Sequence, residues 1–190
     1  MSERKNVNEQ KHHHRGKSSE SLLDKAQILA SLSITPGQTI LDAGCGNGYM
    51  AKEFAKLTGK TGKVYALDPD TISIDILRSE TAGTIIEPFV GDITEETRLV
   101  TASIDLIYLS TVIHGFSEIQ MKGFLNEVRR LLKPDGRLAI VEIKKEVTPF
   151  GPPLDTRLSP EELKQRISLT PVSSINVGQY FYMQIFDNLP

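Results

Sequence analysis

The sequence has little that would cross-link the chain or attract it to nucleic acid. Its 190 residues include one cysteine, so no internal disulfide can form. Basic residues are not in excess, because 22 lysines and arginines stand against 24 aspartates and glutamates, for a formal net charge of -2. Proteins that bind the phosphate backbone of nucleic acid usually carry a basic excess or patch. We therefore expect no nucleic-acid partner.

Long apolar segments are also absent. No apolar run approaches the roughly 20 residues that cross a membrane, and residues 1–17 are polar, without the apolar core of a signal peptide. We therefore expect no membrane partner and a cytoplasmic location. The length fits one domain that can bury a core without metals or disulfides. We divide the chain into a flexible tail, 1–17, and a domain, 18–190, and leave a homodimer open.

Three adjacent histidines, His12–His14, stand in the polar tail. Neighbouring side chains on one segment rarely converge on a metal without carboxylate or thiol partners. A solvated tail is therefore favoured over a metal site, and no metal is expected.

The strongest pattern lies at residues 39–48, Thr-Ile-Leu-Asp-Ala-Gly-Cys-Gly-Asn-Gly. It predicts a short buried strand that ends at Asp42, a turn through alternating glycines and a helix that follows. Gly44, Gly46 and Gly48 place no side chain between the turn and a ligand. The amide N–H groups at the start of the helix would face that ligand with partial positive charge, which suits a carboxylate or phosphate.

The glycine spacing and the preceding acid indicate the charge of the ligand. A dinucleotide fingerprint, G-x-G-x-x-G, would need its third glycine where this chain has Tyr49. Asp42 would repel a pyrophosphate, but it could attract an ammonium or sulfonium group. The pattern therefore favours a ligand that carries positive charge.

Four segments together resemble a known family. Residues 42–48 resemble the first motif of the class I S-adenosylmethionine-dependent methyltransferases. Val64–Asp68 resembles the second strand with its ribose-binding acid, Gly91–Ile93 the adenine-side motif, and Leu131–Leu138 the turn before the fifth strand. Four ordered motifs are far more specific than one glycine loop. The resemblance runs from about Ile34 to the C-terminus and is nearest to the quinone-biosynthesis and other small-molecule methyltransferases.

The resemblance implies an α/β fold, a three-layer α-β-α sandwich. Its seven-stranded, mostly parallel sheet has the order 3-2-1-4-5-7-6, with an antiparallel last strand. Pro88 lacks a ladder donor, which suits the edge position that this order gives to the third strand. After the first strand, the expected strands are Lys63–Asp68, Ile85–Val90, Ile104–Leu109, Leu138–Ile143, Val172–Val177 and Gln179–Phe186.

Helices are predicted where apolar residues recur at helical spacing. The first runs from about Ser19 to Leu32, with Ser21 and Asp24 as a capping box, and should pack on the sheet. Ser-Pro-Glu-Glu at 159–162 predicts an N-capped helix that ends near Ser168. The residues predicted on apolar helix faces include Leu22, Ala26, Leu29, Met50, Phe54, Leu57, Ile72, Ile76, Leu77, Met121, Leu125, Val128 and Leu132.

The ligand of an open α/β sheet lies beyond the carboxyl ends of its strands, where the strand order reverses. The resemblance implies that Asp42 and the loop 44–48 hold the methionine part of S-adenosylmethionine. Asp68 would accept hydrogen bonds from both ribose hydroxyls, and Asp92 with Ile93 would flank adenine. The alternatives are a helix cap for Asp68 and a cap or turn residue for Asp92. The full predicted cofactor-binding set is Asp42, Gly44, Gly46, Asn47, Gly48, Asp68, Pro69, Asp92, Ile93, Leu109 and Ser110.

Methyl transfer from a sulfonium needs alignment of acceptor and methyl group more than a metal or a covalent nucleophile. If the acceptor must lose a proton, His114 after the fourth strand is the best placed base, with a capping or packing histidine as the alternative. Cys45 is expected to be a packing residue. Tyr49, Tyr180 and Tyr182 belong either to an acceptor pocket or, more commonly for aromatic residues, to the core.

The function that the resemblance implies is S-adenosylmethionine-dependent methyl transfer to a small-molecule acceptor. The alternative is a non-catalytic S-adenosylmethionine-binding module or a subunit of a larger methyltransferase complex. A nicotinamide-dependent oxidoreductase is disfavoured by the glycine spacing, and arsenite methylation needs more thiols than Cys45 supplies. Residues 144–158 and 1–17 are expected to be movable covers over the acceptor.

Overall fold

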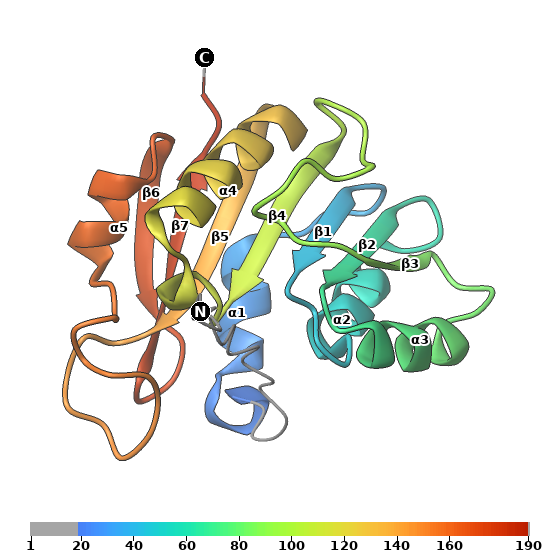
Figure 1. Cartoon of the computed structure of the whole chain (residues 1–190). Coiled ribbons are helices and arrows are strands. Elements are labelled where there is room, and N and C mark those ends of the chain that lie inside the picture. The colour runs from blue at the N-terminus through green and yellow to red at the C-terminus, as the bar shows by residue number, and fades with distance from the viewer. Residues whose placement is uncertain (1–18, 190) are drawn as a thin grey trace, which may run out of the picture.

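A single sheet organises residues 19–189, which are the part of the chain that the computed structural model describes. Its seven strands follow the order β3-β2-β1-β4-β5-β7-β6, as predicted (Figure 1). All pairs among β1 to β5 are parallel, whereas β7 runs antiparallel to both β5 and β6. The strands are β1 (Thr39–Ala43), β2 (Lys63–Asp68), β3 (Ile86–Val90), β4 (Ile104–Ser110), β5 (Leu132–Ile143), β6 (Thr170–Asn176) and β7 (Phe181–Asp187).

Helices cover both faces of the sheet and complete the expected three-layer sandwich (Figure 1). The buried residues of α1, α2 and α3 share one apolar cluster, and those of α4 and α5 share another. None of the helices in the described part of the chain is long and apolar enough to cross a membrane. The helices are α1 (Lys25–Leu32), α2 (Tyr49–Thr58), α3 (Thr71–Glu80), α4 (Glu118–Leu131) and α5 (Pro160–Arg166), with 3-10 turns η1 (Ser19–Leu22) and η2 (Ile113–Gly115).

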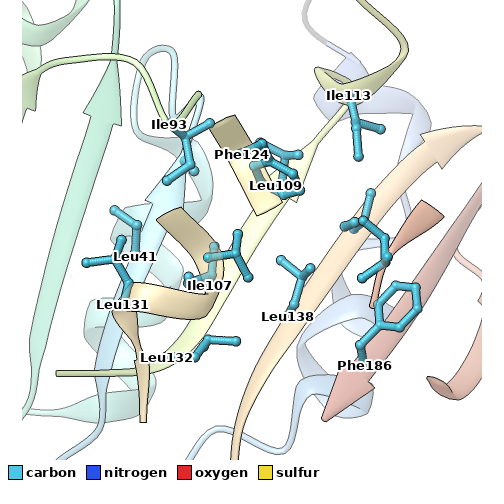
Figure 2. Close-up of a cluster of buried hydrophobic side chains, with 14 of the residues drawn as sticks. Leu41, Ile93, Ile107, Leu109, Ile113, Phe124, Leu131, Leu132, Leu138 and Phe186 are labelled. Carbon is cyan, nitrogen blue, oxygen red and sulfur yellow. The ribbon is translucent and has the colours of Figure 1, made fainter. Parts of the chain in front are cut away.

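The core has two layers because successive residues of a strand point to opposite faces. In β1, Ile40 packs in the cluster under α1–α3 and Leu41 in the cluster under α4 and α5. Figure 2 shows the second cluster, in which Phe124 of α4 lies over the sheet. Phe124 is fully buried, and a side chain of this kind contributes about 1.5–3 kcal/mol on burial.

The N-terminal helix is shorter than predicted. Ser19–Leu22 forms a separate 3-10 turn, and α1 begins only at Lys25. The expected capping box does not start the helix, because Asp24 itself is the N-cap and accepts a hydrogen bond from the Gln27 backbone N–H at 2.9 Å. A side-chain acceptor at this position satisfies one of the free amides of the first turn.

The apolar faces of four predicted helices also differ from the prediction. Leu22 is 42% exposed and Leu57 is 40% exposed, whereas Ile28 and Leu32 are buried on α1. In α4, Leu125 is only partly buried, and the adjacent Phe124, which the periodic row omitted, fills the core. On α3, Ile72 and Ile76 are each 55% exposed, and Leu77 is the buried member of the predicted set. The spacing of apolar residues within one helix cannot decide such positions without the neighbouring sheet.

Prolines stand in both edge strands of the sheet. Pro88 lies in β3, which among the described strands pairs with β2 alone, so its predicted edge position is confirmed. Pro171 lies in β6, at the opposite edge, where the register with β7 shifts. A proline at an edge removes a free N–H that another strand could pair with.

The fifth strand starts earlier than expected. It begins at Leu132, which pairs with Ile104, and the register then shifts so that Leu106 pairs with Arg137. The turn between them has Asp135 at a φ of 62°. Residues 133–136 therefore form an irregularity inside the strand rather than a separate loop before it.

Candidate functional site

The carboxyl ends of β1, β2 and β4 meet at the lower edge of the sheet in Figure 1. β1 pairs with β2 on one side and with β4 on the other, so the strand order reverses next to β1. The loop after β1 and the turns after β2 and β4 consequently surround one point, where ligands of such sheets bind.

The glycine loop is pinned to the end of β2 by backbone hydrogen bonds. The N–H groups of Gly44 and Cys45 donate to the Leu67 carbonyl at 2.7 and 3.0 Å. The Gly46 N–H donates to Asp68 Oδ2 at 2.9 Å. The loop is thus held in place before any ligand arrives, with the Asp68 carboxylate at its side.

Each glycine of the loop has a positive φ, but the three differ in what surrounds them. The φ angles are 72° at Gly44, 51° at Gly46 and 75° at Gly48. A Cβ at Gly44 would lie 2.8 Å from Val112 Cγ2, and one at Gly48 would overlap the Leu77 side chain. A Cβ at Gly46 would have no atom of the described residues within 4 Å, apart from those of its two chain neighbours. Gly44 and Gly48 therefore allow close packing, whereas Gly46 faces open space.

Asp42 is a buried carboxylate at the root of this loop. It is 3% exposed, and its Oδ2 has no hydrogen-bond partner among residues 19–189. Burial raises the pKa of Asp42 to about 7, the nearby Asp68 charge adds to the rise, and a hydrogen bond from the Ala51 backbone opposes it. A buried acceptor without a partner is costly, so this oxygen suits a cationic or hydrogen-bond-donating ligand.

Asp68 orders the turn after β2 without capping the next helix. Its Oδ1 accepts a hydrogen bond from the Asp70 N–H at 2.8 Å, and its Oδ2 binds the glycine loop. The N-cap of α3 is Asp70, which accepts from the Ser73 N–H at 3.2 Å. The alternative interpretation of Asp68 as the helix cap is therefore wrong. Each carboxylate oxygen retains capacity for a further hydrogen bond.

Asp92 makes the contacts of a turn residue, which was the alternative to its predicted role beside adenine. Its Oδ1 accepts hydrogen bonds from the backbone N–H and the hydroxyl of Thr94, both at 2.8 Å. Ile93 is 4% exposed and belongs to the apolar cluster in Figure 2. An adenine-binding role for these two residues rests on their position and on the resemblance.

The other predicted cofactor-binding residues differ in exposure. Asn47 is exposed, and its Oδ1 accepts a hydrogen bond from the Tyr49 N–H at 3.0 Å, at the start of α2. Pro69 is exposed, Ser110 is half-buried at the end of β4, and Leu109 is fully buried. Leu109 can therefore support the site only through packing.

His114 lies in η2, directly after β4, and has a partner that the sequence did not reveal. Its Nδ1 lies 2.8 Å from Oε2 of Glu142, a carboxylate of β5 that is fully buried. Burial lowers the pKa of His114, but the hydrogen bond and charge of Glu142 outweigh this and the pKa is raised. The sequence feature that could have pointed to Glu142 is its position as a single acid within the apolar segment Leu138–Ile143.

Arg157 is a second residue that sequence patterns missed. It is 4% exposed, and its guanidinium donates hydrogen bonds to four backbone carbonyls in the loop between β5 and α5. These carbonyls belong to Lys144, Glu146, Phe150 and Pro152, at 2.8 to 3.1 Å. The loop, expected to be a movable cover, is thus folded around a buried cation.

The three tyrosines proposed for an acceptor pocket have other partners. Tyr182 is buried, and its hydroxyl donates to the Leu158 carbonyl at 2.7 Å. Tyr180 packs edge-to-face on Phe150, with ring centroids 5.2 Å apart. The ring of Tyr49 lies 5.1 Å from Lys25 Nζ. Tyr182 is therefore a core residue.

Cys45 and the histidine run complete the predicted features. Cys45 is 8% exposed, and burial raises the pKa of its thiol, so it packs as a neutral group. Within residues 19–189 no group of three or more histidine, cysteine, aspartate or glutamate side chains could hold a metal ion. His12–His14, and the tail proposed as a second cover, lie outside the described residues.

Comparison with known proteins gives a family and several relatives. Residues 40–136 match the model of the methyltransferase domain family. The chain is 32% identical over 132 residues to the ubiquinone/menaquinone biosynthesis C-methyltransferase of Laribacter hongkongensis, covering 67% of this chain and 52% of the relative. It is 29% identical over 133 residues to the enzyme of the same name from Bordetella avium, covering 69% and 51%.

A solved structure resembles the whole described fold. The crystal structure of a SAM-dependent methyltransferase from Aquifex aeolicus superimposes with a TM-score of 0.81 at 26% sequence identity. The match covers 92% of this chain and 94% of that one. By contrast, the chain spans about half the length of the curated relatives it matches.

Proposed function

We propose that this chain, a member of the methyltransferase domain family, transfers a methyl group from S-adenosylmethionine to a small-molecule acceptor. Its membership follows from the match of residues 40–136 to the family model, and it places the chain within the class I S-adenosylmethionine-dependent methyltransferases. The observation that carries the proposal is the buried Oδ2 of Asp42, which has no hydrogen-bond partner among residues 19–189. It lies at the root of a glycine loop in which a Cβ at Gly46 would meet no neighbouring group of those residues.

The residues at this edge fit S-adenosylmethionine as the cofactor. The Asp42 carboxylate suits the positive charge of an ammonium or sulfonium, since opposite charges attract strongly where water is excluded. Gly46 leaves room for a ligand against the backbone. Asp68 lies beside the loop with acceptor capacity for a ribose diol. The bound cofactor supplies an electrophilic methyl group on sulfur.

The remaining predicted residues complete this proposed site. The backbone of Asn47, Gly48 and Gly44 shapes the loop around the methionine part, and Pro69 follows the ribose-binding acid. Asp92 and Ile93 border the adenine. Ser110 at the end of β4 faces the cofactor, and Leu109 supports it from the core. His114 receives a proton from the acceptor where the acceptor must lose one.

The acceptor is proposed to be a small organic molecule. Two relatives are named as C-methyltransferases of quinone biosynthesis, which supports an aromatic or enolic acceptor over a macromolecule.

We also propose a cytoplasmic enzyme with one domain, 18–190, and no nucleic-acid partner. The non-catalytic binding module remains the competing hypothesis, and transfer of a labelled methyl group to any small-molecule acceptor would eliminate it.

Calorimetric titration tests the cofactor assignment directly. We expect S-adenosylmethionine to bind and NAD not to bind. Asp68→Ala should weaken binding of S-adenosylmethionine by about 1.5–3 kcal/mol, the range for a hydrogen bond to a charged group, which is roughly a 10- to 150-fold rise in Kd. Asp75→Ala, on the exposed surface of α3, is the matched control and should leave the Kd unchanged. Equal Kd values for the two variants would refute the role of Asp68.

A further inference from the structure

His114 and Glu142 form a buried histidine–carboxylate pair beside the proposed cofactor site. We propose that Glu142 is a positioning residue, which holds His114 with its proton on Nδ1 and leaves Nε2 to accept a proton from the methyl acceptor. The acceptor class that follows is a hydroxyl or enol compound, such as a phenol, that gives up a proton on methylation. This inference rests on the proposed function.

The geometry of the pair sets the tautomer of the histidine. Glu142 is fully buried, so its carboxylate cannot turn to water, and its Oε2 lies 2.8 Å from His114 Nδ1. An ionised carboxylate only accepts hydrogen bonds, so Nδ1 must donate. In the neutral imidazole the proton then sits on Nδ1, and Nε2 carries the free lone pair.

The segment that carries this histidine packs against the glycine loop through Val112. Val112 packs so closely on Gly44 that a Cβ on the glycine would lie 2.8 Å from Val112 Cγ2. His114 follows two residues later in η2, and its side chain is 17% exposed. Ser110 of β4 pairs with Val141 of β5, which places Glu142 beside the start of this segment. The dyad thus lies at the carboxyl edge, where the acceptor must approach.

The charged and titratable groups around His114 come from three elements. Glu142 of β5 raises the pKa of His114, and Arg157 of the following loop lowers it. Arg157 is fixed by its hydrogen bonds to backbone carbonyls. Tyr182 of β7 is paired with Glu142 across the strands, and its hydroxyl is occupied by the Leu158 carbonyl. Glu142 is therefore the group that strengthens the base.

The proton balance of the reaction defines the acceptor class. His114 Nε2 takes the proton from the acceptor hydroxyl, and the electron pair left on oxygen, or on the conjugated carbon of an enol, forms the new bond to the methyl carbon. The methyl–sulfur bond breaks with its electron pair on sulfur, so the sulfonium becomes a neutral thioether. His114 then releases its proton to solvent. Net charge is conserved at each stage, and no metal or oxidant is needed.

Nitrogen NMR of the full chain tests the tautomer without an acceptor. The sequence has four histidines, and loss of one signal in His114→Gln assigns the resonance. We expect neutral His114 to be protonated on Nδ1, with a titration midpoint that falls by about one pH unit in Glu142→Gln, as expected when a neighbouring charge is removed. Protonation on Nε2 in the wild type would overturn the proposal, even if the variant failed to fold.

Methyl-transfer assays test the acceptor class. Phenol, 1,3-diketone, primary amine and thiol probes are offered with S-adenosylmethionine, and we expect transfer to the phenol or diketone. Glu142→Gln should lower kcat by about 10²-fold or more, within the range for general-base catalysis, with the KM for S-adenosylmethionine unchanged. The rising limb of its pH–rate profile should move to lower pH. Glu80→Gln, at an exposed acid in the last turn of α3, is the control and should behave as wild type.

The outcomes separate this inference from the proposed function. A protein that binds S-adenosylmethionine but methylates only amine or thiol probes, or none, overturns the acceptor class and leaves the cofactor assignment standing. An unchanged pH profile in Glu142→Gln overturns its positioning role. Failure of the wild-type protein to bind S-adenosylmethionine overturns the proposed function itself.

Discussion

At the scale of single residues, Asp42 links stability to pH in an unusual direction. Its folded pKa of about 7 lies above the ordinary value of 3.8. Between these values the folded state holds the proton more tightly than the unfolded state does. The contribution of Asp42 to stability is therefore largest at low pH and is lost as pH rises to about 7. A positively charged ligand would reverse this cost, because it favours the ionised form.

Asp42→Asn should remove this pH dependence. Relative to the variant, we expect the wild type to lose about 1 kcal/mol of unfolding free energy per pH unit between pH 5 and 7. Denaturant unfolding at the two pH values measures the difference. Asp155→Asn, in an exposed part of the loop before α5, should follow the wild type. Asp42→Asn should also weaken binding of S-adenosylmethionine. If the unfolding free energies of the wild type and Asp42→Asn changed equally with pH, the raised pKa of Asp42 would be contradicted.

The residues that sequence analysis found and missed differ in their local signal. Asp42 stands at a strand end before alternating glycines, so local pattern alone indicated a ligand site. Glu142 and Arg157 are single polar residues within an apolar strand and an irregular loop. Their roles depend on which distant groups the sheet brings near them, and no spacing rule in one sequence contains that information.

At the scale of elements, α4 makes an unusually close contact through Gly123. A Cβ at this position would overlap the backbone carbonyl of Thr94. Helix propensity alone would make Gly123→Ala stabilising by about 1 kcal/mol. Because a backbone carbonyl cannot move aside as a side-chain tip can, we expect Gly123→Ala to destabilise the fold by at least about 1 kcal/mol. Thermal unfolding measures this, with the exposed Asn126→Ala on the same helix as the control.

The loop between β5 and α5 depends on one side chain. Arg157→Lys keeps the charge but cannot reproduce the planar set of donors that hold the backbone carbonyls. We expect protease cleavage within residues 144–158 to become several-fold faster in this variant, with mass spectrometry locating the cut. Arg166→Lys, on the exposed side of α5, is the control, and protease should cleave its residues 144–158 at the wild-type rate. Equal rates in all three proteins would show that Arg157 does not fix the loop.

Element boundaries show where local sequence ceases to decide structure. The capping box at Ser159 and Glu162 starts α5 as predicted, because every atom it needs lies within one turn. The start of β5 at Leu132 was missed, because pairing with Ile104 and Leu106 in β4 extends the strand through a turn-like sequence. Movement of the loop 144–158 as a cover stays a prediction, and it would require release of Arg157.

At the scale of the molecule, the strand order follows the prediction, and the core lies on both faces of the sheet because β1, β4 and β5 carry apolar residues on each side. Ile40 and Leu41 of β1 show this alternation, with neighbours buried on opposite sides. The order itself came from the resemblance, since apolar patterning identifies strands but cannot say which of them are neighbours.

The two outermost strands carry a consequence for self-association. Pro88 and Pro171 interrupt the free amide row on the borders of the sheet. Because proline has no N–H, the ladder of hydrogen bonds to a strand of a second copy would be interrupted at Pro88 or Pro171. Fibril-like stacking through either edge of the sheet is therefore disfavoured. We therefore expect two copies of this molecule not to join through the outer edges of β3 and β6.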